Sequence, residues 1–267
     1  MIEFNNIHLQ LGNTSVLHSI NLSIAESGMT AIIGPNGAGK SSLLSLMTQS
    51  CKPQKGNILI DNIALTDIPR RKLATYLSVL RQDNHLQARL KVKELISFGR
   101  FPYHQGNPGQ EDWHKIKEVM ALLELEGYAE RYVDELSGGQ RQRAYVAMVL
   151  AQDTQYLFLD EPLNSLDMRY ANSLMQCLRN ITDQQNKSIV LVLHDINYAS
   201  YFCDRIIALK DGKVFTQGHR AEVMQLDILT GLYDMPLTLH QIGKKALCLP
   251  YFADKPESSF GLTTASY

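Results

Sequence analysis

Residues 34–41, with the sequence GPNGAGKS, restrict the possible folds of this chain more than any other segment. They fit the pattern GxxxxGK[S/T], in which uncovered glycine amides and the start of the next helix wrap a phosphate group. A short apolar run at residues 30–33 precedes the segment, and an apolar helical stripe at residues 41–49 follows it. The order strand, loop, helix therefore predicts a nucleotide-binding loop.

The loop also has the residue types that phosphate chemistry needs. Lys40 is expected to reach the β- and γ-phosphates, and the hydroxyl of Ser41 is expected to bind Mg²⁺. The alternative, an ordinary glycine turn, is disfavoured by the strand and helix on either side. The candidate nucleotide-binding residues of this segment are Gly34, Pro35, Asn36, Gly37, Ala38, Gly39, Lys40, Ser41 and Ser42.

Strand-like and helical patterns alternate through much of the chain. Further buried-strand candidates are residues 57–60, 76–80, 156–159, 188–193 and 205–209, with helical patterns at 92–98, 111–125, 138–151 and 168–185. This alternation predicts an α/β fold with a mostly parallel sheet. After residue 213 the sequence favours short strands and turns.

Two parts of the chain depart from this alternation. Residues 2–11 and 16–24 are strand-like and are separated by a turn signal. Residues 83–151 contain helical patterns and no convincing buried strand, so we interpret them as a helical subdomain inserted into the α/β core. The alternative is a long crossover connection within one domain. Residues 253–267 are small and polar and are expected to form a disordered tail.

Four apolar residues and then two acids occupy residues 156–161 (YLFLDE). A buried parallel strand that ends here places carboxylates at the sheet edge where ligands of open α/β sheets bind. Asp160 is expected to hold Mg²⁺, directly or through water. Because neighbouring side chains of a strand point to opposite sides, Glu161 is expected to be free to polarise the attacking water. The alternative is a pair that only caps the strand end.

A second anion-binding helix start lies at residues 136–140 (LSGGQ). Ser137 is a good N-cap, and Gly138 and Gly139 leave backbone amides uncovered before Gln140. Since residues 34–41 already hold the phosphates of one nucleotide, a second start is most useful if it meets a nucleotide held by another copy of the chain. Head-to-tail pairing uses both loops twice and closes with twofold symmetry. A cap without a ligand is the alternative.

The composition disfavours several classes of protein. Lys and Arg total 26 against 27 Asp and Glu, a formal net charge of −1, which argues against a globally basic nucleic-acid-binding protein. No apolar run approaches the length of a membrane span, and no signal-peptide pattern is visible. The four cysteines form no CxxC motif and are expected to be reduced thiols of a cytosolic protein.

Together GPNGAGKS, LSGGQ and FLDE, in this order and spacing, resemble the nucleotide-binding subunits of ABC transporters. The resemblance extends from residue 2 to about residue 252. It implies one domain over residues 1–252, with a P-loop ABC-type ATPase core, a RecA-like sheet, an antiparallel β lobe and the inserted helical subdomain. It also implies ATP and Mg²⁺ as ligands and a homodimer that drives two membrane-spanning permease subunits.

The resemblance assigns further residues. Gln82 matches the Q-loop glutamine, which contacts Mg²⁺ and water, and His194 matches the switch histidine, which contacts the γ-phosphate. Asp167, in the segment SLD, matches the D-loop, which crosses the dimer. The family's aromatic residue that stacks on adenine is replaced by Leu11, which offers apolar surface without stacking. The implied catalytic residues are Glu161, His194 and Gln82, and the implied metal ligands are Ser41, Gln82 and Asp160.

A narrower resemblance concerns residues 98–103 (FGRFPY), 138–154, 161–168 (EPLNSLDM) and 194–197 (HDIN). These segments resemble the ATPases of iron–siderophore importers, whose relatives carry haem and cobalamin. This implies ferric siderophore uptake, a periplasmic or lipid-anchored binding protein as an indirect partner, and a location on the cytoplasmic face of the bacterial inner membrane. Haem or cobalamin import and a separate-chain exporter are alternatives. A non-transport ABC ATPase is disfavoured because no heptad run occurs.

The helical interval between Gln82 and Leu136 is expected to dock the cytoplasmic helices of the membrane subunits. Arg100, Phe101 and Tyr103 are candidates for this contact. Phe101 packed inside the helical subdomain is an equal alternative.

Overall fold

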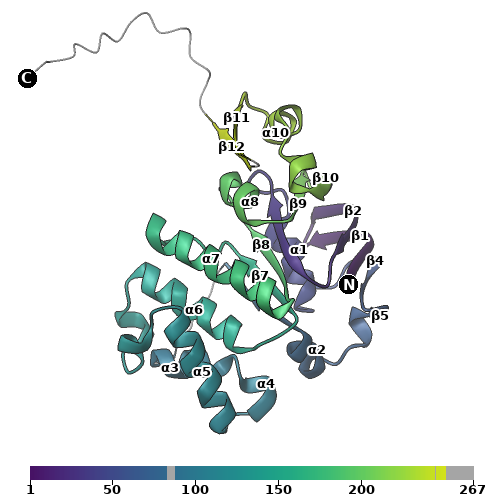
Figure 1. Cartoon of the computed structure of the whole chain (residues 1–267). Coiled ribbons are helices and arrows are strands. Elements are labelled where there is room, and N and C mark those ends of the chain that lie inside the picture. The colour runs from purple at the N-terminus through teal and green to yellow at the C-terminus, as the bar shows by residue number, and fades with distance from the viewer. Residues whose placement is uncertain (83–87, 244, 251–267) are drawn as a thin grey trace, which may run out of the picture.

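The computed structural model describes residues 1–82, 88–243 and 245–250 (Figure 1). A six-stranded sheet runs through the centre in the order β10-β9-β3-β8-β7-β6. Its strands are β3 (Gly28–Ile33), β6 (Leu77–Leu80), β7 (Tyr156–Asp160), β8 (Ser188–Val192), β9 (Arg205–Lys210) and β10 (Lys213–His219). All neighbours pair in parallel except β9 and β10. The carboxyl ends of β3, β7 and β8 therefore meet at one edge of the sheet, as the phosphate loop and the acidic pair require.

A separate antiparallel sheet has the order β2-β1-β4-β5. It consists of β1 (Ile2–Leu11), β2 (Thr14–Ile24), β4 (Lys55–Ile60) and β5 (Ile63–Ala64). Buried apolar residues of this sheet share one core with α1 (Lys40–Met47) and with one face of the central sheet. Because α1 is packed between two sheets, the helix start that follows the phosphate loop is held firmly. A 3₁₀ turn (Leu65–Asp67) and α2 (Arg70–Tyr76) complete the connection to β6.

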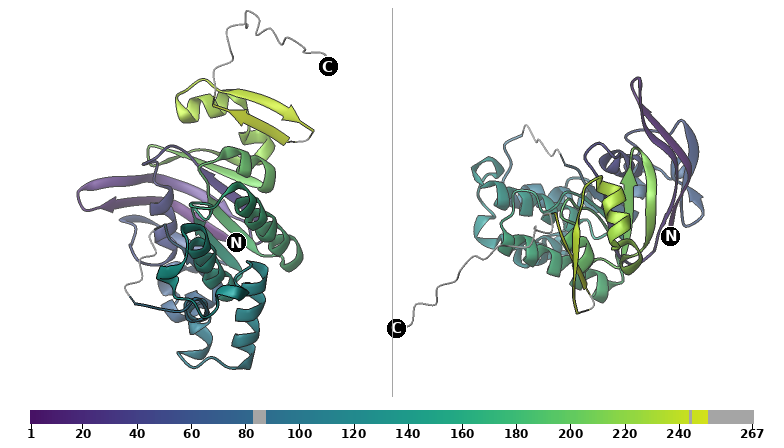
Figure 2. Two further views of the ribbon diagram at one scale, coloured as in Figure 1. Left: turned by 90° about the vertical axis from the view of Figure 1, so that its left-hand side faces the viewer. Right: turned by 90° about the horizontal axis from the view of Figure 1, so that it is seen from above.

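Between β6 and β7 the described residues form helices and turns. They are α3 (Val92–Phe98), α4 (Phe101–His104), α5 (Gln110–Leu122) and α6 (Gly138–Ala151), with 3₁₀ turns at Glu126–Tyr128 and Val133–Glu135. Within residues 88–151 the extended pairing is limited to one isolated bridge, between Lys91 and Tyr132. These helices group together beside the central sheet (Figures 1 and 2), and we interpret them as the inserted helical subdomain. Residues 83–87 of the predicted interval lie outside the described residues.

The helices after β7 pack against the second face of the central sheet, and a separate two-stranded hairpin follows them. The helices are α7 (Met168–Gln185), α8 (Ile196–Phe202), α9 (Arg220–Val223) and α10 (Leu226–Tyr233), followed by a hairpin of β11 (Thr238–Ile242) and β12 (Lys245–Leu249). The expectation of only short strands and turns after residue 213 was wrong, because α10 is a helix that buries Leu229 and Leu232. Its eight residues give too short an apolar stripe for a periodicity argument. The predicted tail at residues 253–267 lies outside the described residues.

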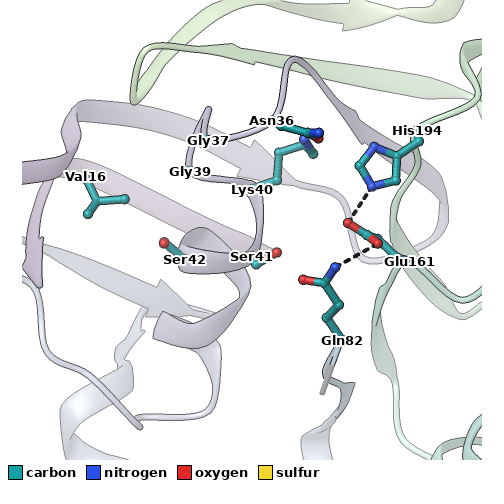
Figure 3. A pocket seen from close by; sticks show the side chains of 10 residues that line it. All are labelled: Val16, Asn36, Gly37, Gly39, Lys40, Ser41, Ser42, Gln82, Glu161 and His194. Carbon is teal, nitrogen blue, oxygen red and sulfur yellow. Dashed lines mark hydrogen bonds and ion pairs between the residues drawn. The ribbon is translucent and has the colours of Figure 1, made fainter. Parts of the chain in front are cut away.

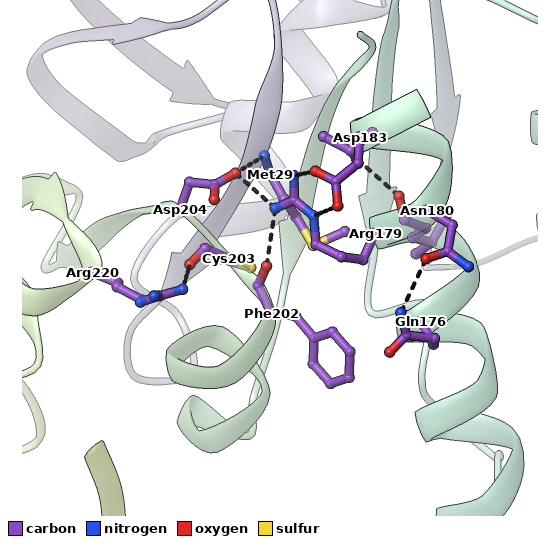
Figure 4. A network of polar contacts seen from close by, with 11 residues as sticks. Met29, Gln176, Arg179, Asn180, Asp183, Phe202, Cys203, Asp204 and Arg220 are labelled. Atoms are coloured by element: carbon purple, nitrogen blue, oxygen red, sulfur yellow. Dashed lines mark hydrogen bonds and ion pairs between the residues drawn. The ribbon is translucent and has the colours of Figure 1, made fainter. Parts of the chain in front are cut away.

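An ionic network fastens α7 to the amino-terminal end of the central sheet (Figure 4). The guanidinium of Arg179 donates to Asp204 at 2.8 Å and to the carbonyl of Phe202 at 3.3 Å, and it also contacts Asp183. The Asp204 carboxylate in turn accepts the amide of Met29 at 2.8 Å, at the start of β3. This network fixes the sheet at the end opposite the phosphate loop. No helix among the described residues is long and apolar enough to cross a membrane.

Candidate nucleotide-binding and catalytic site

The phosphate loop joins β3 to α1 in a conformation that only glycine adopts easily. Gly34 and Gly39 have φ of +144° and +97°, in the left-handed half of the map. A Cβ on Gly34 would lie 2.0 Å from the carbonyl oxygen of Leu209, and one on Gly39 would lie 2.5 Å from a methyl group of Leu17. The loop is therefore pressed against its surroundings on one side, and on the other side Gly37 and Gly39 line a cavity.

A cavity of about 420 Å³ opens above this loop (Figure 3). Figure 3 shows that Lys40, Gln82, Glu161 and His194 converge on it from four different segments of the chain. The lining residues are Val16, Asn36, Gly37, Gly39, Lys40, Ser41, Ser42, Gln82, Glu161 and His194. The fold thus brings together the phosphate loop and all three residues predicted to be catalytic.

Two backbone carbonyls of the phosphate loop hold the Lys40 side chain over the loop. Its ammonium group donates to the carbonyls of Gly34 and Pro35, both at 2.9 Å. Burial lowers the pKa of Lys40, and the nearby carboxylates of Glu161 and Asp160 oppose that effect. Carbonyls are neutral acceptors, so an entering phosphate oxygen offers this ammonium a stronger, charge-assisted partner.

Asp160 meets the requirements of a ligand for a hard cation. It is 4% exposed, and its Oδ1 atom has no hydrogen-bond partner among the described residues. Burial raises the pKa of Asp160 and Glu161 adds to the rise, while Ser41, Lys40 and His194 oppose it. Asp160, Ser41 and Gln82 line a smaller cavity of about 150 Å³ beside the phosphate loop. A buried unpaired carboxylate oxygen, a hydroxyl and an amide oxygen are the donors that Mg²⁺ prefers, so this set fits the metal.

Glu161 is separated from Asp160 for a different reason than the one predicted. The strand β7 ends at Asp160, and Glu161 is the first residue beyond it, with φ of +51°. This left-handed turn, rather than strand alternation, directs the Glu161 carboxylate into the larger cavity. A glutamate in this region of the map is unusual and costs conformational energy, a feature typical of functional sites.

The Glu161 carboxylate is held by three side chains. Its Oε1 lies 2.5 Å from Nε2 of His194, and its Oε2 accepts the amide of Gln82 at 3.0 Å. The amide of Asn164 also donates to Oε2. Gln82 follows β6, Asn164 follows β7, and His194 follows β8, so the three partners come from separate segments of the chain. The carboxylate is therefore fixed in orientation before any substrate enters.

Three residues at this site were not predicted. Asn164 contacts the Glu161 carboxylate directly, and Gln142 of α6 donates to the backbone carbonyls of Glu161 and Pro162 at 3.4 and 3.2 Å. The proline and asparagine shortly after Glu161 are a turn signal that could have indicated the first contact. Val16 of β2 lines the cavity, but its apolar side chain carries no functional signal in the sequence.

The predicted signature segment lies outside this cavity. Ser137 caps α6, with its hydroxyl accepting the amide of Gln140 at 3.3 Å while its own amide donates to the Gln140 side chain at 3.0 Å. Ser137 and Gly138 are exposed. A Cβ on Gly139 would lie 3.0 Å from the carbonyl oxygen of Ser165, so this helix start packs against the predicted D-loop. Neither of these two segments lines the cavity above the phosphate loop of its own chain.

Two further predicted residues lie at the start of a helix and at the end of a strand. Asp167 is the N-cap of α7 and accepts the amide of Tyr170 at 2.9 Å. Leu11 ends β1 and is 47% exposed. It does not line the cavity, whereas Val16, on the neighbouring strand, does.

Comparisons with known proteins show which family the chain belongs to. Residues 17–164 match the family model described as ABC transporter. The chain is 42% identical to the petrobactin import ATP-binding protein YclP of Bacillus subtilis, over 92% of this chain and 98% of the relative. It is 36% identical to the iron(3+)-hydroxamate import ATP-binding protein FhuC of the same organism, over 92% of this chain and 93% of the relative.

A solved structure gives the same result for the fold. An ATP-binding cassette described as dimeric, in a post-hydrolysis state with ADP and phosphate bound, superimposes with a TM-score of 0.75. It is 31% identical and covers 82% of this chain and 99% of its own. The chain belongs to the ABC transporter family. Its predicted fold class is confirmed, and it is an ATP-binding ATPase whose hydrolysis is coupled to transport.

Proposed function

We propose that this chain is the motor subunit of an importer for ferric siderophores. The observation that carries the proposal is the similarity, over more than nine tenths of the chain, to import proteins whose names specify petrobactin and iron(3+)-hydroxamate. The chain would act on the cytoplasmic face of the cell membrane, driving two membrane-spanning permease subunits. A periplasmic or lipid-anchored binding protein would deliver the cargo to them.

The residues of the cavity have distinct roles in ATP hydrolysis. The phosphate loop and Lys40 bind and orient the triphosphate. Glu161 accepts a proton from the attacking water at its carboxylate, and Gln82 and His194 hold that carboxylate in place. Ser41, Gln82 and Asp160 would hold Mg²⁺, which neutralises phosphate charge when bound.

Hydrolysis in this proposal requires two copies of the chain. Gly138 is exposed and Gly139 is half-buried, and neither residue lines the cavity of its own chain. They would complete the phosphate site of the second copy, with Asp167 near the junction. The similar structure with ADP and phosphate is described as dimeric, which supports this pairing. Closure on ATP and opening after hydrolysis would then drive the permease subunits.

The permease subunits would dock on the helical subdomain. Phe98 at the end of α3 and Phe101 at the start of α4 are both exposed, which favours docking over the alternative that Phe101 packs inside. Arg100, between them, is instead used internally, because it donates to Asp112 at 2.9 Å. Exposed aromatic side chains of this kind are enriched at protein interfaces.

The cargo is tested by uptake of radioactive iron in cells that lack this chain. The cells would be offered a catecholate siderophore, a hydroxamate siderophore and haem, each loaded with iron. We expect loss of uptake of at least one siderophore, rescued by the wild-type chain and not by the Glu161→Gln variant. Loss of haem uptake alone, or normal uptake of every siderophore, would contradict the proposal.

A further inference from the structure

The side chain of Gln142, near the start of α6, contacts the backbone of the turn that follows β7. Its amide nitrogen donates to the carbonyl of Glu161 at 3.4 Å and to the carbonyl of Pro162 at 3.2 Å. Gln142 is half-buried and does not line the nucleotide cavity. Its route to the reaction therefore runs through the backbone that it contacts.

The backbone of Glu161 needs support from its surroundings. Its φ of +51° lies in the left-handed region, which a glutamate adopts at a cost in conformational energy. Such a conformation persists only where neighbouring contacts hold it. Within the turn, the amide of Asn164 donates to the Glu161 carbonyl at 3.2 Å. Gln142 adds a hold on the same carbonyl from a different element of the fold.

The helix that carries Gln142 is a firm base for this contact. Residues 143–147 of α6 are all buried. At the other end of the helix, the C-cap residue Gln152 donates to the carbonyls of Ala74 and Leu77 at 2.6 and 3.1 Å. Because α6 is fixed along its length, the Gln142 amide is held at a set position relative to the turn.

The backbone of Glu161 decides where its carboxylate lies. His194 and Gln82 contact the carboxylate itself and fix its orientation in the cavity (Figure 3). The dihedral φ sets the direction in which the side chain leaves the backbone. A return of this φ to the ordinary negative range would therefore carry the carboxylate away from both partners.

We propose that Gln142 is a positioning residue for ATP hydrolysis. Its amide stabilises the left-handed conformation of Glu161 and so keeps the carboxylate directed at the attacking water. A side-chain amide suits this task because it carries two N–H groups, enough for the carbonyls of both Glu161 and Pro162. This inference rests on the role proposed above for Glu161.

The first experiment measures phosphate release and ATP binding by the full chain. Gln142→Met keeps the length of the side chain and removes both donors. It is expected to lower kcat about tenfold and to leave the dissociation constant for ATP unchanged, because a displaced catalytic group slows the reaction without weakening substrate binding. Gln142→Lys, which keeps a donor, is expected to recover part of the rate.

The matched control is Gln152→Met. It removes the same kind of contact, one side-chain amide shared by two carbonyls, at the opposite end of α6. Urea unfolding of both variants compares what each loses in stability. Gln152→Met is expected to keep the wild-type kcat, so a general loosening of the helix cannot account for the slower Gln142→Met variant.

The second experiment asks whether Gln142 acts through the Glu161 carboxylate. In a Glu161→Gln background there is no carboxylate to position, so adding Gln142→Met is expected to leave the residual rate unchanged. A residue that acted elsewhere in the site would slow both backgrounds by the same factor, since independent effects on the barrier are additive.

The outcomes separate the inference from the function on which it rests. If Glu161→Gln hydrolyses ATP at the wild-type rate, the proposed role of Glu161 itself fails. If Glu161→Gln is slow, three results would each overturn only the role of Gln142. They are a wild-type kcat for Gln142→Met, an equal loss of kcat in Gln152→Met, and a full tenfold effect in the Glu161→Gln background.

Discussion

In the proposed hydrolysis, Glu161 is the residue that accepts the proton from the attacking water. Its backbone adopts a left-handed turn, and its carboxylate is held by His194, Gln82 and Asn164. Glutamine has the same shape but cannot accept a proton at neutral pH. We therefore expect Glu161→Gln to bind ATP and to release phosphate about 100-fold more slowly, or slower still. Phosphate release and a sizing column measure both effects, and rapid turnover without dimer accumulation would remove Glu161 as the base.

Asn164 provides a second test at the scale of one side chain. Its amide donates to Glu161 and it does not line the cavity. Asn164→Ala is expected to lower kcat about tenfold and to leave the dissociation constant for ATP unchanged, since a small displacement of a catalytic group slows the reaction. Asn164→Ser, which keeps a donor, is expected to recover part of the rate. Equal rates for the wild type and the alanine variant would contradict a positioning role.

Residue types identified the candidate site better than they described its geometry. The phosphate loop and Asp160 could be predicted because glycines, a lysine and an apolar run before acids have local physical meanings. The three side-chain contacts of the Glu161 carboxylate could not be predicted. They join segments that are as distant in sequence as Gln82 and His194. Leu11 and Val16 show the same limit, since the position of a β turn relative to the cavity depends on how two sheets pack.

Among the elements, the helices between β6 and β7 are joined by one largely buried ion pair. Arg100, just before α4, donates to Asp112 in α5 at 2.9 Å, and also to the carbonyl of Ala151 at the end of α6 at 3.1 Å. The amide of Gly109 donates to the same aspartate at 2.9 Å. Three helices thus share this contact, which fixes their relative orientation.

The pair makes stability depend on pH in a defined direction. Burial alone would raise the pKa of Asp112, but the Gly109 amide and the Arg100 guanidinium lower it below its ordinary value. A depressed folded-state pKa stabilises the native state above the unfolded-state pKa, near 4, and this contribution is lost as pH falls through the folded-state pKa.

We therefore expect Asp112→Asn to lower the free energy of unfolding at pH 7 by about 2 kcal/mol. The difference from the wild type should shrink as pH falls below about 4. Urea unfolding of the full chain at several pH values measures it. The control is Asp134→Asn, which removes an exposed pair with Arg89 and is expected to change stability by less than about 0.5 kcal/mol. A pH-independent difference would contradict this account.

The elements themselves differ in how far the sequence determines them. The buried parallel strands and the long helices α5, α6 and α7 follow from apolar runs and periodicity. The helix α10 and the β11–β12 hairpin do not, because they are short and are stabilised by contacts with α8 and the central sheet, such as those of Asn197 with Cys248. Tertiary packing decides the structure of such segments.

At the scale of the whole molecule, the two helix starts predicted to bind phosphate lie in different parts of the fold. The loop before α1 lines the cavity, whereas the start of α6 does not line it and packs against Ser165 and Leu166. In the proposed pairing, the start of α6 of one copy would complete the phosphate site of the other copy.

The central claim is that each ATP site is shared between two copies, and the Ser137→Arg variant tests it most directly. Ser137 is exposed and lies outside the cavity of its own chain, so ATP binding should be retained while the side chain blocks the partner's phosphate. His114→Arg, at an exposed position of α5, controls for an added arginine on the same subdomain. We expect phosphate release by Ser137→Arg to fall about 100-fold or more and His114→Arg to match the wild type. Phosphate release by Ser137→Arg at the wild-type rate would contradict the shared site.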